Sequence, residues 1–168
     1  LGDVYKRQTY SLPARQVANG VVDSFIHVVE QYLTYPVNAK VQDAFSEGLM
    51  RVIHEEGLKV LDNPNDYDIR ANLMWAATNA LNVWIGQGVP QDWSSHRMGY
   101  ALTAQFGLDH AQTLAILLPG VMTYMFKEKQ VKLARMGEVV FGITDGTEEE
   151  RARKAIVACE DFFRRMGL

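Results

Sequence analysis

The chain has 168 residues, about the length of one domain, and 48% of them are hydrophobic while 22% are charged, a composition that excludes a disordered tail or a collagen-like repeat. Its 17 basic and 20 acidic side chains leave a net charge of −3, which argues against a nucleic-acid partner or an anionic membrane surface. No run of about 18 apolar residues predicts a membrane span, and the single cysteine cannot form an internal disulfide, so we expect a soluble, cytoplasmic domain.

The first half of the chain predicts three helices. Residues 1–8 show no hydrophobic period, and we interpret them as a leader that is not native to the fold. From residue 14 to 34, and again from 38 to 61, apolar side chains recur every three or four residues, as on one face of a helix. Asp, Asn and Pro then predict a loop over 62–66, and an Ala-, Leu- and Met-rich segment predicts a helix over 68–85.

A loop rich in glycine separates this half from the next helix. Either Asp92 or Ser94 can cap that helix, which we expect to break at Gly107. A further helix begins near Asp109 and is predicted to bend or end around Pro119, because proline cannot donate the backbone hydrogen bond of a helix interior.

Two more helices complete the prediction. One covers residues 128–141, and the other opens with a capping box formed by Thr147 and Glu150. About seven helices with short loops predict an all-α bundle. Neither a GxGxxG turn nor a P-loop lysine motif is present, so the chain carries no recognisable nucleotide-binding turn.

Asp23 and His27 form the first candidate site. They are four residues apart in the first predicted helix, so both side chains leave the same face about one turn apart. Such a pair can bind a metal ion, or it can form an ordinary surface hydrogen bond. Their neighbours along the helix are mostly valine, isoleucine and phenylalanine, and a carboxylate and an imidazole buried among them would need partners.

His96 and His110 lie on either side of the predicted break at Gly107. In one straight helix they would be ~21 Å apart, so they can share an ion only if the chain turns between them. Each histidine alone is also typical of a core or capping position. Together with Asp23 and His27 they would supply one carboxylate and three imidazoles, a set that suits Zn²⁺ or Fe²⁺ better than Mg²⁺ or Ca²⁺.

The other aromatic and sulfur side chains carry weaker signals. His54 is interpreted as structural or solvated, and Cys159 as a small core residue. The three tryptophans fall at helical spacing, and we expect Trp75 and Trp84 to be mostly core. Trp93, three residues before His96, is either a core residue or a wall of a substrate pocket.

Three separate segments carry a family resemblance. Residues 18–32 resemble the metal-ligand helix of the iron-containing alcohol dehydrogenases, residues 92–100 resemble that family's third-ligand segment, and residues 107–115 resemble its fourth. The spacings of 4, 69 and 14 residues between the candidate ligands match as well. The likeness is closest to the branch of NADPH-dependent aldehyde reductases and butanol dehydrogenases, and it covers the chain from about residue 9 to its end.

The resemblance implies a two-domain enzyme, with an N-terminal α/β domain that binds NADP(H) and a C-terminal helical domain that holds one divalent ion. Residues 9–168 would form most of that helical metal-binding domain. The ion, Fe²⁺ or Zn²⁺, would be held by Asp23, His27, His96 and His110. The resemblance also implies a homodimer of the full-length protein.

The implied reaction interconverts an aldehyde and a primary alcohol, with the ion as Lewis acid and the nicotinamide as hydride carrier. Many members of the family have a histidine four residues after the third ligand, where this chain has Tyr100. A phenol donates a hydrogen bond but is a poor base near pH 7, so Tyr100 is either catalytic or a packing residue. The alternatives are a helical metal-binding module and a helical interaction domain, both without redox activity.

Overall fold

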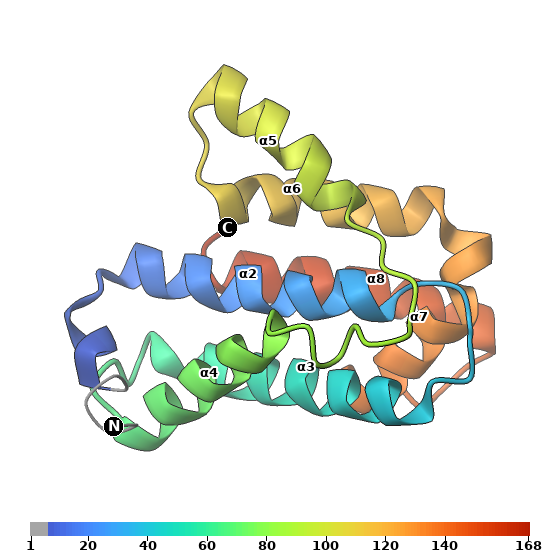
Figure 1. Cartoon of the computed structure of the whole chain (residues 1–168), viewed down its shortest axis with the longest axis horizontal. Coiled ribbons are helices and arrows are strands. Elements are labelled where there is room, and N and C mark those ends of the chain that lie inside the picture. Colours follow the sequence, from blue (N-terminus) through green and yellow to red (C-terminus); the bar gives the residue numbers. More distant parts are fainter. Residues whose placement is uncertain (1–6) are drawn as a thin grey trace.

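The computed structural model describes residues 7–168, and all regular structure in this range is helical (Figure 1). From residue 9 to the end of the chain, a single 3-10 turn and seven α-helices follow one another: η1 (Thr9–Ser11), α2 (Ala14–Tyr32), α3 (Lys40–Val60), α4 (Tyr67–Ala80), α5 (Ser94–Phe106), α6 (His110–Tyr124), α7 (Phe126–Phe141) and α8 (Glu148–Arg165). The predicted all-α architecture is therefore confirmed. The leader predicted at residues 1–8 lies, except for Arg7 and Gln8, outside the described residues. None of the described helices combines the length and apolar character needed to cross a membrane.

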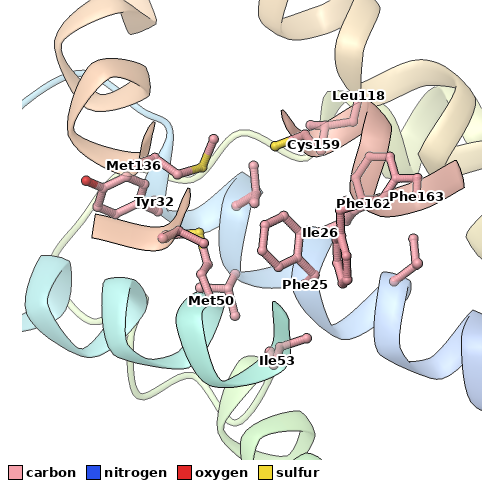
Figure 2. Close-up of a cluster of buried hydrophobic side chains, with 14 of the residues drawn as sticks. Phe25, Ile26, Tyr32, Met50, Ile53, Leu118, Met136, Cys159, Phe162 and Phe163 are labelled. Carbon is pink, nitrogen blue, oxygen red and sulfur yellow. The ribbon is translucent and has the colours of Figure 1, made fainter. Parts of the chain in front are cut away.

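Helix α2 lies at the centre of the molecule and contacts α3, α4 and α6, while α7 and α8 pack closely on each other (Figure 1). The core that joins them is built around Phe25, whose side chain is fully buried. Its ring centroid lies 5.1 Å from that of Phe162 and 6.2 Å from that of Phe163 (Figure 2). Cys159 is fully buried in the same cluster, as predicted, and burial raises the pKa of its thiol.

Helix α5 projects from this body and packs mainly against α6 (Figure 1). Only Ser95, His96 and Gly99 of α5 are buried, all of them in its first two turns. The N-cap of this helix is Trp93, so the prediction of Asp92 as the cap is wrong by one residue, although Asp92 Oδ1 does accept a hydrogen bond from the Ser94 backbone N–H at 3.1 Å. The other predicted cap, Ser94, is instead the first residue of the helix.

Two helices end earlier than predicted. Helix α2 stops at Tyr32, and the free carbonyl of Leu33 accepts a hydrogen bond from the buried Lys129 ammonium. Helix α4 stops at Ala80 rather than at residue 85, and the side-chain amide of Gln31 donates to the Ala80 carbonyl at 2.7 Å. In both cases a polar side chain distant in sequence satisfies the helix end, so the local pattern could not reveal the boundary.

The expectation that Trp75 and Trp84 are core residues is wrong. Their side chains are 66% and 56% exposed. Trp75 lies on the outer face of α4, and Trp84 follows the early end of that helix, where Val83 has a positive φ of 65°. The helical period predicted for 68–85 does not extend to Trp84, so its spacing no longer places it on a buried face.

In the second half of the chain the helix boundaries lie close to the predicted ones, except at Pro119. Helix α6 continues through Pro119 to Tyr124, so of the two predicted outcomes the ending at Pro119 is wrong. Packing of α6 against α2, α5 and α8 holds the helix together despite the missing N–H of the proline. The capping box of α8 is confirmed, because Thr147 Oγ1 accepts from the Glu150 N–H and the Glu150 carboxylate accepts from the Thr147 N–H.

Candidate metal centre

The first two candidate residues lie on the central helix. Asp23 and His27 leave the same face of α2, and His27 Nε2 lies 3.5 Å from Asp23 Oδ1. The helix is fixed in place because Phe25 and several valines on its other faces are buried in the core. The two side chains are themselves only partly covered, with 33% of Asp23 and 14% of His27 exposed. They therefore lie on a rigid frame but close to the surface.

His96 and His110 reach the same place from two further helices. His96 lies in the first turn of α5, and His110 is the first residue of α6. Between them Gly107 ends α5 with a left-handed φ of 66°, a conformation that glycine adopts without steric cost. The Nε2 atoms of His96 and His110 lie 3.7 Å and 3.5 Å from Asp23 Oδ1. The predicted break at Gly107 thus brings together two histidines that a straight helix would hold apart.

The separations among Asp23, His96 and His110 fit a single divalent ion, and His27 lies next to His96. One ligand atom each of Asp23, His96 and His110 lies within 4.8 Å of the other two, and His27 Nε2 lies 3.2 Å from His96 Nε2. Four ligand atoms at about 2.0–2.1 Å from a tetrahedral zinc ion would be about 3.4 Å apart. Asp23 Oδ1 is buried and has no hydrogen-bond partner among the described residues. With one carboxylate and three imidazoles, the set can hold Zn²⁺ or Fe²⁺.

The charges in the site favour a cation between these side chains. Burial alone would raise the pKa of Asp23, but the facing imidazoles of His27 and His96 outweigh it and hold that pKa well below its usual range. Burial would likewise lower the pKa of His96, whereas the carboxylates of Asp23 and Glu30 raise it to about 9. Positive charge at this point, carried by a proton or by a metal ion, is therefore stabilised by two carboxylates.

Glu30 is a residue of this site that the sequence analysis missed. Its side chain is 3% exposed, and it accepts hydrogen bonds from the Ser95 backbone N–H at 2.6 Å and from His96 Nδ1. A signal was present in the sequence. Glu30 lies seven residues after Asp23 and three after His27, which places it on the same helix face. A carboxylate among apolar neighbours also has to be paired.

Asp109 fixes the position at which α6 begins. Its Oδ2 atom accepts hydrogen bonds from Arg15 Nε at 2.6 Å and Asn19 Nδ2 at 2.7 Å, both on α2, and these bonds lower the pKa of Asp109. Its backbone N–H donates to Gln112 Oε1 at 3.1 Å. Because His110 is the next residue, these contacts also set the place of its imidazole relative to α2. A cavity of about 280 Å³ opens here, and Asn19, Asp23, Asp109 and His110 are among the residues that line it.

Trp93 and Tyr100 border the site on different sides. Trp93 is half-buried, and its ring centroid lies 5.5 Å from that of His27 and 5.2 Å from that of His96. Tyr100 is 62% exposed and stacks on His110, with 5.9 Å between ring centroids and 12° between the planes. Tyr100 therefore packs through the ring face that stacks on His110, while its phenol oxygen lies at the rim of the site. Trp93 is a wall of the histidine cluster rather than part of the main core.

The chain matches known proteins over nearly its whole length. Residues 17–168 match the model of the Fe-containing alcohol dehydrogenase family, C-terminal. The chain is 55% identical over 160 residues to the NADPH-dependent aldehyde reductase YqhD of Escherichia coli, covering 95% of this chain and 41% of that protein. It is 44% identical over 161 residues to the NADP-dependent alcohol dehydrogenase 3 of Entamoeba histolytica, again covering 95% of this chain and 41% of the relative.

Solved structures show the same relationship in three dimensions. The substrate- and cofactor-free aldehyde reductase YqhD of E. coli superposes with a TM-score of 0.94 at 54% identity, over 96% of this chain and 43% of that one. The NADH-dependent butanol dehydrogenase A of Thermotoga maritima gives a TM-score of 0.90 at 30% identity, over 96% and 40%. The chain therefore spans about two fifths of the length of these relatives. By its sequence and its fold, the chain belongs to the Fe-containing alcohol dehydrogenase family and corresponds to its C-terminal domain.

Proposed function

We propose that this chain is the metal-binding domain of an oxidoreductase that interconverts an aldehyde and a primary alcohol with NADP(H). The observation that carries the proposal is the convergence of Asp23, His27, His96 and His110, from three helices, on one point. The names of the E. coli and Entamoeba relatives support the reaction and the choice of NADP(H). We assign nucleotide binding mainly to the part of those relatives that this chain does not span.

In this proposal the four side chains hold one Fe²⁺ or Zn²⁺. When bound, the ion supplies Lewis acidity that polarises a substrate carbonyl oxygen or stabilises the corresponding alkoxide. Asp23 is the one carboxylate among the proposed ligands and offsets part of the ionic charge directly, while Glu30 adds a second negative charge behind His96. The buried faces of α2 keep Asp23 and His27 in register, so the geometry of these two ligands is set before any ion or substrate binds.

The aromatic residues at the border have separate proposed roles. Trp93 lies against His27 and His96 and excludes water from that side of the cluster. Tyr100 presents a hydroxyl donor at the rim next to His110, where a substrate oxygen would arrive. For the full-length protein we also propose a homodimer, which light scattering after size-exclusion chromatography would test.

Metal analysis of the purified chain tests the first part of the proposal. We expect about one Zn or Fe per chain, and loss of that metal in the double variant Asp23→Ala/His96→Ala. His54→Gln is the matched control, because His54 lies on α3 against Phe141 and Phe162, away from the cluster. Circular dichroism establishes that each variant is folded. A folded wild-type chain that takes up no metal would contradict the proposal and favour the helical interaction domain.

NADPH oxidation tests the second part. The 168 residues alone are expected not to turn over an aldehyde, whereas a full-length protein that contains them should do so and should lose the activity on His96→Ala. Activity of the isolated chain would contradict the assignment of nucleotide binding to another domain. A full-length protein that holds metal but does not oxidise NADPH with any aldehyde would indicate the metal-binding module without redox function.

A further inference from the structure

One residue of α2, Glu30, makes three polar contacts with the segment that carries His96. The Glu30 backbone carbonyl accepts a hydrogen bond from the Asp92 N–H at 3.0 Å. One carboxylate oxygen accepts from the Ser95 N–H at 2.6 Å, and the other faces His96 Nδ1 within hydrogen-bond distance. The carboxylate and the imidazole are both almost fully buried, with 3% and 7% of their side chains exposed. Water does not compete for these hydrogen bonds, so the chemistry of the paired groups decides which one donates and which one accepts.

The chemistry of this contact decides which nitrogen of His96 carries a proton. An ionised carboxylate only accepts hydrogen bonds, so His96 Nδ1 must donate to Glu30. In a neutral imidazole the other nitrogen, Nε2, then has a free lone pair. That atom is the one which points to Asp23 at 3.7 Å and to His27 at 3.2 Å. The same contact therefore orients the ring and leaves its free nitrogen at the centre of the cluster.

We propose that Glu30 is the positioning residue of this site, which selects the His96 tautomer able to bind a divalent ion. The inference rests on the proposed metal-binding function and deepens it by naming a residue that acts through a ligand rather than on the ion. Loss of a hydrogen-bond partner behind a ligating histidine lowers metal affinity by about 10- to 100-fold in other metal sites, which sets the size of the effect.

The substitution Glu30→Gln separates this role from simple packing. A glutamine has nearly the same shape but offers one acceptor oxygen and one NH₂ donor where Glu30 offers two acceptors. The Ser95 N–H is a backbone donor and cannot reverse. If the amide oxygen turns to Ser95, its NH₂ faces His96 Nδ1 and selects the tautomer that places a proton on Nε2. If the amide turns the other way, NH₂ faces the Ser95 N–H, and that buried donor loses its partner.

The test measures Zn²⁺ affinity of the purified chain by competition with a chromophoric chelator, and records the visible absorption of the Co²⁺-loaded protein as a report on coordination. We expect Glu30→Gln to weaken Zn²⁺ binding by about 10- to 100-fold and to alter the Co²⁺ spectrum. Glu47→Gln is the matched control. It makes the same chemical change on α3, where the carboxylate pairs with Tyr32 and Arg135, and it should leave both readouts as in the wild type.

Hydrogen exchange of the metal-free proteins separates positioning from anchoring of α5. The proposal expects Glu30→Gln to keep the amide protection of α5, and a weaker Zn²⁺ site accompanied by a loss of that protection would overturn it. Unchanged Zn²⁺ affinity and Co²⁺ spectrum in Glu30→Gln would also overturn it, while leaving the metal site itself in place. A wild-type chain that binds neither ion would overturn the proposed function together with this inference. If Glu30→Gln does not fold, ¹⁵N NMR of the histidines in the Zn²⁺-loaded wild type decides the question: the proposal expects a proton on His96 Nδ1, and a proton on His96 Nε2 would overturn it.

Discussion

Helices α2, α3, α7 and α8 bury most of their large apolar side chains, whereas α5 of the α5–α6 pair exposes most of its own. Phe25 and Met50 in the first group are fully buried, but Met98, Tyr100 and Phe106 of α5 are 45%, 62% and 61% exposed. Little apolar area holds α5 to the body, so a low local stability is expected for it. The candidate metal site spans this boundary, because two of its residues lie on the buried α2 and two on the α5–α6 pair.

The two sides of the candidate site are held in place by different kinds of contact. The core side holds Asp23 and His27 whether or not an ion is present. His96 depends on polar contacts of the first turn of α5, chiefly with Glu30, and His110 depends on the contacts of Asp109 with α2. An ion that joins both sides would stabilise α5 more than it stabilises α7 and α8. The predictions below follow from this contrast, beginning with the largest effect.

The largest effect is expected for Phe25→Ala in the core. The substitution leaves a cavity among Phe162, Phe163 and Phe141, and such changes cost about 3–5 kcal/mol. Urea unfolding monitored by circular dichroism measures the loss. Val157→Ala on α8, where the valine is 64% exposed, is the control and should change the free energy of unfolding by less than about 0.5 kcal/mol. Similar losses in the two variants would mean that the aromatic cluster is not the main source of stability.

Two glycine substitutions test each side of the boundary with the same added methyl group. A Cβ at Gly57 would lie 2.6 Å from Val21 Cγ1 in the core, and one at Gly99 would lie 2.7 Å from Thr113 Oγ1 between α5 and α6. Overpacking of this kind costs about 1–3 kcal/mol. We expect Gly57→Ala to lower the free energy of global unfolding. Gly99→Ala should instead increase hydrogen exchange in α5 and weaken Zn²⁺ binding, since Thr113 Oγ1 also bonds to the His110 carbonyl.

The reverse pattern would contradict the contrast between the two regions. A Gly99→Ala variant that unfolds globally at lower urea, with exchange raised equally in α5 and α8, would mean that the α5–α6 pair folds as one unit with the core. A Gly57→Ala variant with weakened Zn²⁺ binding but unchanged global stability would mean that α2 is not the rigid side of the site.

Much of this organisation could be predicted from local signals in the sequence. The apolar spacing predicts the helix that carries Asp23 and His27. His96 and His110 come together because the chain turns at Gly107, and the glycine itself indicates that turn. Glycine has no Cβ, so its left-handed φ is a property of the residue itself and needs no knowledge of the fold. The metal assignment of these residues stays a prediction, because spacing and geometry identify which side chains can meet and not what they bind.

The features that could not be predicted depend on contacts between distant residues. The end of α4 at Ala80 is fixed by Gln31, and the end of α2 coincides with a bond from Lys129 to the Leu33 carbonyl. The sequence analysis missed Glu30 for the same reason, because its hydrogen-bond partners Ser95 and His96 lie 65 and 66 residues away in the sequence. Helical periodicity identifies the face on which Glu30 lies, but it contains no information on which segment covers that face.

A smaller effect is expected at the start of α8, on the core side. Thr147→Ala removes the hydroxyl that accepts from the Glu150 N–H at 3.2 Å, and loss of such a cap costs about 1 kcal/mol. The loss should appear in global unfolding without a change in Zn²⁺ affinity, because α8 contributes none of the candidate ligands. Thr147→Ser keeps the acceptor and is expected to behave like the wild type. Equal stability of the Ala and Ser variants would show that the capping box contributes nothing measurable.

The smallest effect is a pH dependence of the core side that arises from His54. Burial beside aromatic rings lowers the pKa of His54 from its ordinary 6.5, and three nearby charges modify this shift: Arg165, which lowers it, and Glu55 and Asp161, which raise it. The unfolded chain therefore binds a proton more readily than the folded one, so stability falls as the pH decreases below about 6.5. Urea unfolding of metal-free wild type and His54→Gln from pH 8 to pH 5 isolates this contribution, because every other titratable group is the same in both proteins. The wild type should lose more stability than the variant on acidification, and parallel curves would mean that His54 is protonated as easily in the folded protein as in the unfolded one.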